Sequence, residues 1–144
     1  MSSHHQLAII DCQAAGISGD MFLGALLDLG ADVTKVVNAI KSIENYVKEC
    51  KNLRVSIRTV KRRGLCAKKV DVKAEGTIET KGIELIESVE QCVNNLRLSE
   101  KTKQFASNSI RTLVNTEAKI HGEKLDEVHL HEAGQVDTPA EIIG

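Results

Sequence analysis

The stretch LRVSIRTVKRRGLCAKKVDVKA, residues 53–74, decides the fold. Apolar side chains occupy every second position of residues 53–57 and again of residues 70–74. A period of two is typical of strands that bury one face. The basic linker KRRG, residues 61–64, ends in glycine and predicts the turn of an antiparallel hairpin.

Two helices are expected before the hairpin. Ser18 can cap a helix that runs to about Leu29, and Gly30 can end it. Because the sequence MFLGALLDL is apolar nearly all round, this helix is expected to be buried. Asp32 can cap the second helix. The apolar face of that second helix is expected to comprise Val33, Val36, Val37, Ile40, Ile43 and Val47.

Two more helices are expected after the hairpin. The first spans about 82–97, and its inward residues are expected to be Ile86, Val89, Val93 and Leu96. The second begins at the Ser99 cap and runs to about His121, where Gly122 can stop it. Its buried face is expected to comprise Ala106, Ile110, Leu113, Glu117 and Ile120.

Short strands are expected at both ends of the chain. The apolar run LAIID, residues 7–11, predicts a buried strand, and EVHLHE, residues 127–132, predicts a last one. This order predicts one α+β domain over residues 1–144, a two-layer sandwich whose small mixed or antiparallel sheet has helices on one face. A helix that starts at Pro139 would have barely one turn before Gly144, which favours a truncated or divided domain.

Composition narrows the class of protein. The 144 residues suit one domain, and aromatic residues are only 2%, which predicts an aliphatic core. Nineteen Lys and Arg balance twenty Asp and Glu, so neither nucleic acid nor an anionic membrane is an expected partner. No apolar run approaches the roughly 20 residues of a membrane span. The four cysteines form no CxxC pair, which favours reduced thiols in a cytoplasmic protein.

A first candidate site lies in DCQAAGISGD, from Asp11 to Asp20, which includes the glycines Gly16 and Gly19. A strand, a glycine turn and a helix N-terminus together can bind an anion through backbone N–H groups near Ser18. Asp20 suits the helix dipole but would repel a bare phosphate. It becomes useful if a divalent cation bridges, which Asp11 could share, or if it orients a positive group. A capped turn without a ligand is the alternative.

A second candidate site lies in VHLHE. If this segment is extended, His129 and His131 point to the same side about 7 Å apart and can converge on one metal. Leu130 would then face the core. Glu132 would point the other way unless the strand ends there, and Asp137 could supply a carboxylate ligand. The alternative is that both histidines are surface residues of an edge strand.

A third candidate site is the basic end of the hairpin. It carries five positive charges, on Lys61, Arg62, Arg63, Lys68 and Lys69. Among them Arg62, Arg63 and Lys68 are predicted to bind an acidic or phosphorylated small molecule, because guanidinium groups bind phosphate in a bidentate manner. A solvated hairpin end is the alternative.

Three stretches resemble the LarC family, the nickel-pincer cofactor biosynthesis proteins. They are DCQAAGISGDMFLGALLDLGAD, the basic hairpin VKRRGLCAKKVDV, and EAKIHGEKLDEVHLHEAGQVDTPAEIIG. They occur in the family's order and cover nearly the whole chain, and GISGDM and VHLHEAGQVD are specific together.

The resemblance implies an activity. Such proteins insert nickel into pyridinium-3,5-bisthiocarboxylic acid mononucleotide with consumption of CTP. The resemblance implies that Asp11, Ser18 and Asp20 belong to a first, catalytic site. We expect the GISGD turn, with Gly16 and Gly19, to hold the phosphorylated substrate together with the basic hairpin. The resemblance implies that His121, His129, His131, Glu132 and Asp137 belong to a second site. In that site we expect the histidines and a carboxylate to handle Ni²⁺, because imidazole suits nickel.

The chain also departs from the family. Family members usually have Asp where this chain has Glu141, Pro139 lies inside the final motif, and the members are much longer. The resemblance is therefore to the N-terminal half. CTP, with Mg²⁺ or Mn²⁺, is expected to bind the missing C-terminal half or a separate partner chain, and a homo-oligomer is expected. The isolated chain is not expected to complete the reaction. A metal-independent binding module for a phosphorylated metabolite and an oligomerisation domain are the alternatives.

Overall fold

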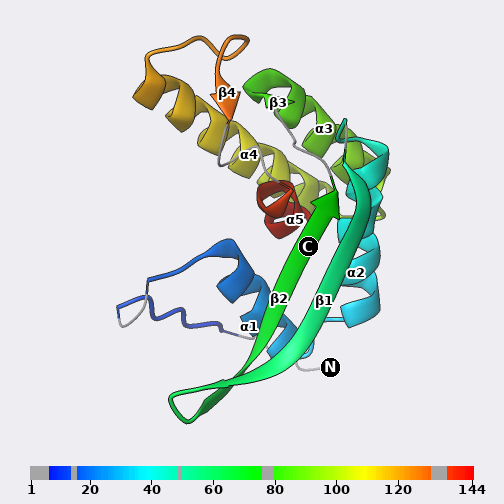
Figure 1. Cartoon of the computed structure of the whole chain (residues 1–144), viewed down its shortest axis with the longest axis vertical. Helices are drawn as coiled ribbons and strands as arrows, with labels where there is room; N and C mark the ends of the chain where they lie inside the picture. Colours follow the sequence, from blue (N-terminus) through cyan, green and yellow to red (C-terminus); the bar gives the residue numbers. More distant parts are fainter. Residues whose placement is uncertain (1–6, 14–15, 49, 76–79, 131–135) are drawn as a thin grey trace, which may run out of the picture.

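The computed structural model describes residues 7–13, 16–48, 50–75, 80–130 and 136–144. Helices and small antiparallel sheets form the α+β class of fold that the sequence predicts (Figure 1). The elements are α1 (Gly19–Asp28), α2 (Val33–Lys41), the 3₁₀ turn η1 (Ser42–Asn45), β1 (Lys51–Arg62), β2 (Leu65–Glu75), β3 (Thr80–Lys81), α3 (Gly82–Asn95), α4 (Glu100–His121), β4 (His129–Leu130) and α5 (Asp137–Ile143).

The hairpin of β1 and β2 is confirmed. Its antiparallel register sets Val55 opposite Val72 and continues to Arg62 opposite Leu65. The two residues between the strands, Arg63 and Gly64, have positive φ angles of 48° and 88°. Positive φ at both central positions matches the right-handed twist of the flanking strands. The turn is therefore shorter than the four-residue linker, because two of those residues extend β1.

One face of the hairpin packs against helices. Leu53 and Val70 are buried on this face, and α1 lies along β2 while α2 lies along β1 (Figure 1). The other face carries Arg54, Arg58 and Lys73, which are exposed. The predicted layer of helices over one face of a small sheet is thus present.

The second sheet is minimal. It pairs Thr80 of β3 with Leu130 of β4, and it lies beside the helix pair α3 and α4. Leu130 is buried, as predicted from the alternation in VHLHE. Of the predicted last strand, the described residues in strand form are His129 and Leu130, and they pair with β3 rather than with the hairpin.

Three of the predicted helix ends are confirmed. The Asp32 carboxylate accepts the backbone N–H groups of residues 34 and 35, and the Ser99 hydroxyl accepts that of residue 102. Gly122 ends α4 in the left-handed conformation, with φ of 67°. Each of these three residues satisfies backbone groups that a helix end leaves free.

The predicted face of α4 is partly wrong. Ile120 is 70% exposed, whereas Val114 and Ala118 are buried. The buried stripe of α4 advances in steps of four, through Ala106, Ile110, Val114 and Ala118. The prediction alternated steps of three and four after residue 110, which rotated the expected face toward solvent.

The predicted first strand is wrong. Residues 7–11 form no strand, and Leu7 and Ile9 are each 87% exposed. Helix α1 contacts β2, and the Lys68 carbonyl oxygen lies where a Cβ at Gly24 would be. Because a helix lies against the backbone of β2, a third strand cannot pair there.

The expectation that the first helix is buried all round is also wrong. Helix α1 buries Leu23, Gly24 and Leu27 against the hairpin. Its opposite side is exposed, including Phe22 and Leu29. Among the described residues, only the side of α1 that faces the hairpin is covered.

The short helix α5 begins at Asp137, two residues before the predicted start at Pro139. Its Ala140 and Ile143 are buried, and it contacts α1, α2, α3 and α4 as well as β2. Packing rather than length therefore stabilises this helix. No helix in the described part of the chain combines the length and apolar character that crossing a bilayer requires.

Candidate functional site

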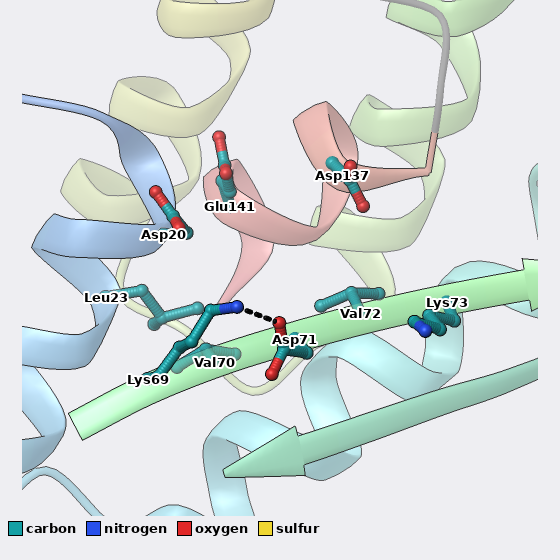
Figure 2. A pocket seen from close by; sticks show the side chains of 9 residues that line it. All are labelled: Asp20, Leu23, Lys69, Val70, Asp71, Val72, Lys73, Asp137 and Glu141. Atoms are coloured by element: carbon teal, nitrogen blue, oxygen red, sulfur yellow. Dashed lines mark ion pairs between the residues drawn. The ribbon is translucent and has the colours of Figure 1, made fainter. Parts of the chain in front are cut away.

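Helices α1 and α5 meet strand β2 around a pocket with a volume of about 270 Å³. Figure 2 shows Asp20 of α1 and Asp137 and Glu141 of α5 along one side of it, with β2 along the other. The residues that line the pocket are Asp20, Leu23, Lys69, Val70, Asp71, Val72, Lys73, Asp137 and Glu141. The site thus joins the two ends of the chain to the middle of the hairpin.

Glu141 lies against the N-terminus of α1. A Cβ built at Gly19 would come within 2.7 Å of the Glu141 Cβ and closer still to its carboxylate. The backbone of Asp20 hydrogen-bonds to that carboxylate. A negative charge is favourable at this position, because the first N–H groups of a helix are free and the helix dipole is positive there.

The predicted cap of α1 acts differently from the other caps. Ser18 makes no side-chain bond to a free N–H group of the helix. Its hydroxyl instead donates to the Asp20 carboxylate, which also accepts the Met21 backbone N–H at 2.8 Å. Ser18 therefore orients Asp20, and Glu141 provides the charge at the helix end.

Burial and mutual repulsion act on the acidic side of the pocket. Burial, and then the negative charge of Asp20, raise the pKa of Asp137 above its ordinary value. Burial and the charge of Asp20 also raise the pKa of Glu141, against the backbone hydrogen bond from Asp20, and the charge of Asp137 adds to the rise. The three carboxylates are thus close enough to interact with one another.

The β2 side of the pocket is mostly basic. The Lys69 Nζ lies 2.7 Å from a carboxylate oxygen of Asp71, as Figure 2 shows, and Arg58 lies 3.1 Å from the other oxygen. These two cations hold the pKa of Asp71 below its ordinary value, with the hydrogen bond from Lys69 as the larger cause. Lys73 is exposed on the same strand.

Other residues predicted for the first and third sites lie outside the pocket lining. Asp11 is exposed and accepts the Gln13 backbone N–H at 2.9 Å. Gly16 has φ of 71°, which suits the predicted glycine turn. The hairpin end holds Arg62 and Arg63, which are exposed. The Nζ atom of Lys68 donates to Thr59 Oγ1 at 3.0 Å.

The predicted histidine site is only partly within the described residues. His129 is exposed on β4, and it is absent from the residues that line the pocket. His131 and Glu132 lie outside the described residues. His121 pairs instead with Glu117, with 3.6 Å between Nε2 and Oε2.

No group of three or more His, Cys, Asp or Glu in the described ranges is arranged to hold a metal ion. Asp137, predicted as a metal ligand beside the histidines, lines the pocket together with Asp20. The structure therefore joins one residue from each of the first two predicted sites in a single pocket.

Sequence reasoning counted Lys69 among the charges of the third site but left the charged pocket residues Asp71, Lys73 and Glu141 out of the predicted sites. Lys69 and Lys73 alternate with the buried positions of β2, and this period of two was a readable signal. For Glu141 the only signal was its departure from the family's usual Asp. Spacing gave no indication that Glu141 would meet Gly19.

These features describe a class of protein: an α+β chain whose first and last helices set acidic side chains opposite a basic strand. The chain matches the family model described as nickel insertion protein over residues 8–144. It belongs to that family.

Named relatives agree with the family. The chain is 36% identical to a protein named for nickel insertion from Methanothermobacter thermautotrophicus, over 96% of this chain and 33% of that protein. It is 32% identical to the pyridinium-3,5-bisthiocarboxylic acid mononucleotide nickel insertion protein of Clostridium kluyveri, over 93% of this chain and 35% of that protein. The chain is 32% identical to the protein of the same name from Akkermansia muciniphila, over 94% of this chain and 34% of that protein. No solved structure matches the chain.

Proposed function

We propose that this chain is the part of a nickel insertion protein that binds the pyridinium-3,5-bisthiocarboxylic acid mononucleotide and Ni²⁺ before the metal is inserted. Family membership supports the reaction, and the names of the Clostridium and Akkermansia relatives support the substrate. The chain spans about a third of the length of those relatives, so the complete activity is a proposal for this chain.

The pocket between α1, α5 and β2 is the observation that carries this proposal. It unites Asp20 of the GISGD turn with Asp137 of the VHLHEAGQVD segment, and it adds Lys69 and Lys73 of the hairpin. The three stretches that carry the family resemblance thus meet at one place. A pocket with opposite charges on its two sides suits a ligand that itself carries both signs.

The substrate has this mixed charge. Its pyridinium ring is positive, whereas its phosphate and thiocarboxylates are negative. The Asp20, Asp137 and Glu141 carboxylates are suited to the ring or to an arriving Ni²⁺. Lys69 and Lys73 are suited to the anionic groups. In this assignment the metal lies beside Asp137 and Glu141, two carboxylates whose charged form burial disfavours.

The proposal assigns two further tasks. His129 and His131 deliver or hold Ni²⁺ before it is inserted, because imidazole is a good nickel ligand. CTP, with Mg²⁺ or Mn²⁺, is bound by the region that the longer relatives have in addition, present as a continuation or as a separate chain. The reaction takes place in the cytoplasm, where free thiols such as Cys66 are stable.

Calorimetric titration of the mononucleotide, without metal, tests the pocket. Asp20→Asn with Asp137→Asn should weaken binding at least about tenfold if the carboxylates face the pyridinium ring, which corresponds to about 1.4 kcal/mol. Lys69→Gln with Lys73→Gln should weaken it and reduce its dependence on salt. Lys35→Gln with Lys101→Gln, on exposed lysines away from the pocket lining, is the matched control.

Titration of Ni²⁺ tests the metal part. Residues 1–5 are removed from every protein compared, because His4 and His5 would bind nickel themselves. Binding that is lost in His129→Ala with His131→Ala, and kept in the control Lys35→Gln with Lys101→Gln, supports the histidine assignment. A folded wild-type chain that binds neither Ni²⁺ nor the mononucleotide would contradict the proposed function. Mononucleotide binding that is indifferent to nickel and to both histidines would favour a metal-independent binding module.

A further inference from the structure

One side of α1 exposes a continuous apolar stripe. Phe22, Leu26 and Leu29 follow one another at helical spacing, and Ile17 and Met21 flank them. All five are exposed, and Leu29 is 81% exposed. These five residues are named here the α1 outer face.

An exposed apolar segment precedes this face in the chain. Leu7, Ile9 and Ile10 are all more than half exposed. The segment 7–11 has no strand partner among the described residues. An apolar run without a partner strand is able to pair with another chain segment.

The contrast with α3 shows that this exposure is not general. Helix α3 buries Leu85, Ile86 and Val89, and its exposed positions include Glu87 and Gln91. Helix α1 is apolar on both sides, which is typical of a helix that is covered on both sides. Large exposed apolar patches mark interaction surfaces.

We propose that the α1 outer face and residues 7–10 form the docking surface for the remaining two thirds of a nickel insertion protein. The relatives supply the argument for this occupant, because this chain covers only 33–35% of their length in the three comparisons above. The partner surface is therefore apolar and belongs to the region of those relatives that lies outside the matched third.

The position of α1 favours this occupant over a second copy of the chain. The same helix bears Asp20, which lines the pocket at its N-terminal end, and the α1 outer face on its far side. A region docked on α1 lies beside the proposed substrate pocket, where a nucleotide-consuming region must act. The inference in this respect rests on the proposed function, although the docking itself requires no nickel or substrate.

The test uses a chimaera in which this chain replaces the matched third of the Clostridium kluyveri relative. An exposed thiol is placed at Leu29→Cys, in a background with Cys12→Ser and Cys66→Ser that leaves only the buried Cys50 and Cys92 of this chain. Its rate of maleimide labelling is measured in the chimaera and in the isolated chain. Phe105→Cys, on the exposed side of α4, is the matched control because Phe105 is 74% exposed. We expect labelling at residue 29 to slow at least about tenfold in the chimaera, since burial of an interface excludes the reagent, while labelling at residue 105 stays unchanged.

A second measurement covers the case of a chimaera that fails to fold. The remaining region of the relative is expressed separately and mixed with the labelled chain, and Phe22→Glu with Leu26→Glu should abolish the protection of residue 29. Equal labelling of residue 29 with and without the remaining region, in both formats, would overturn the proposal. Protection that appears in the isolated chain as its concentration rises would assign the face to a second copy instead. Neither readout depends on nickel or nucleotide, so failure here is distinct from failure of the proposed function.

Discussion

Gly19 at the start of α1 and Glu141 in α5 are complementary in shape. The Glu141 side chain occupies the space that any Cβ at position 19 would require. A Cβ at position 19 would lie only 2.7 Å from the Glu141 Cβ. The backbone at Gly19 is not in the left-handed region, so glycine is required there for space rather than for its conformation. This contact fixes α5 against α1 and thereby sets Asp137 beside Asp20.

Substitution Gly19→Ala should therefore destabilise the fold. Alanine favours a helix more than glycine does, yet the added methyl group must displace Glu141. We expect a loss of about 1–3 kcal/mol in the free energy of unfolding, which is typical of overpacking. Urea denaturation followed by circular dichroism measures it.

The double variant with Glu141→Ala is the control for this steric cause. Removing the larger side chain should restore much of the stability that Gly19→Ala loses, which appears as a strong coupling in a double-mutant cycle. Additive effects of the two substitutions would contradict a direct clash.

Asp137→Asn should alter how stability depends on pH. Burial and the charge of Asp20 raise the pKa of Asp137, so the folded state holds this proton more tightly than the unfolded state does. The stability is fully present below the ordinary value of 3.8 and is lost as pH rises through the raised pKa of the folded state. The variant has no such loss, so it should melt at a higher temperature than wild type at about pH 7 and differ little at about pH 3.

Thermal melts across this range measure the effect. Asp28→Asn, on the exposed side of α1, removes an equal charge away from the pocket and serves as the control. An Asp137→Asn variant that melts at or below the wild-type temperature at neutral pH would refute the assigned repulsion.

The two serine caps should differ in their contribution to stability. Ser99 accepts the Thr102 backbone N–H, so Ser99→Ala should cost about 1 kcal/mol. Ser18 makes no such bond to its helix, so Ser18→Ala should cost clearly less. Its effect should appear in ligand binding, because its hydroxyl hydrogen-bonds to Asp20. Chemical denaturation of both variants decides, and equal losses of stability would contradict the distinction.

The four cysteines should react with thiol reagents at different rates. Cys66 is exposed and Cys12 is half-buried, whereas Cys50 and Cys92 are buried. Burial raises the pKa of both Cys50 and Cys92, which lowers the share of reactive thiolate. In the native protein, a disulfide reagent should modify Cys66 first and leave Cys50 and Cys92 until denaturant is added. Rapid modification of all four thiols without denaturant would contradict the buried positions.

Most of the fold could be predicted from local patterns in the sequence. The alternation in β1 and β2 predicted the hairpin, and Asp32, Ser99 and Gly122 predicted helix ends that the structure confirms. Each of these features depends on neighbours within a few positions in the chain. For residues 7–11 the local pattern was not sufficient. A strand forms there only if the edge of a sheet is free, and α1 lies against β2.

The site was harder to predict for the same physical reason. Asp20 and Asp137 were both recognised as site residues, yet they were assigned to separate sites, because spacing in the sequence says nothing about which helix ends meet. The contact of Gly19 with Glu141 depends on how α5 packs among the other elements, through buried residues such as Ala140. Only the tertiary arrangement brings these groups together.

The acidic side of the pocket comes from α1 and α5, the first and the last helix of the chain. During synthesis, a nascent polypeptide that has reached only as far as α4 carries Asp20 without its two acidic neighbours. The carboxylate cluster therefore does not exist until nearly the whole of this segment has left the ribosome. An incomplete chain would lack the acidic side of the pocket.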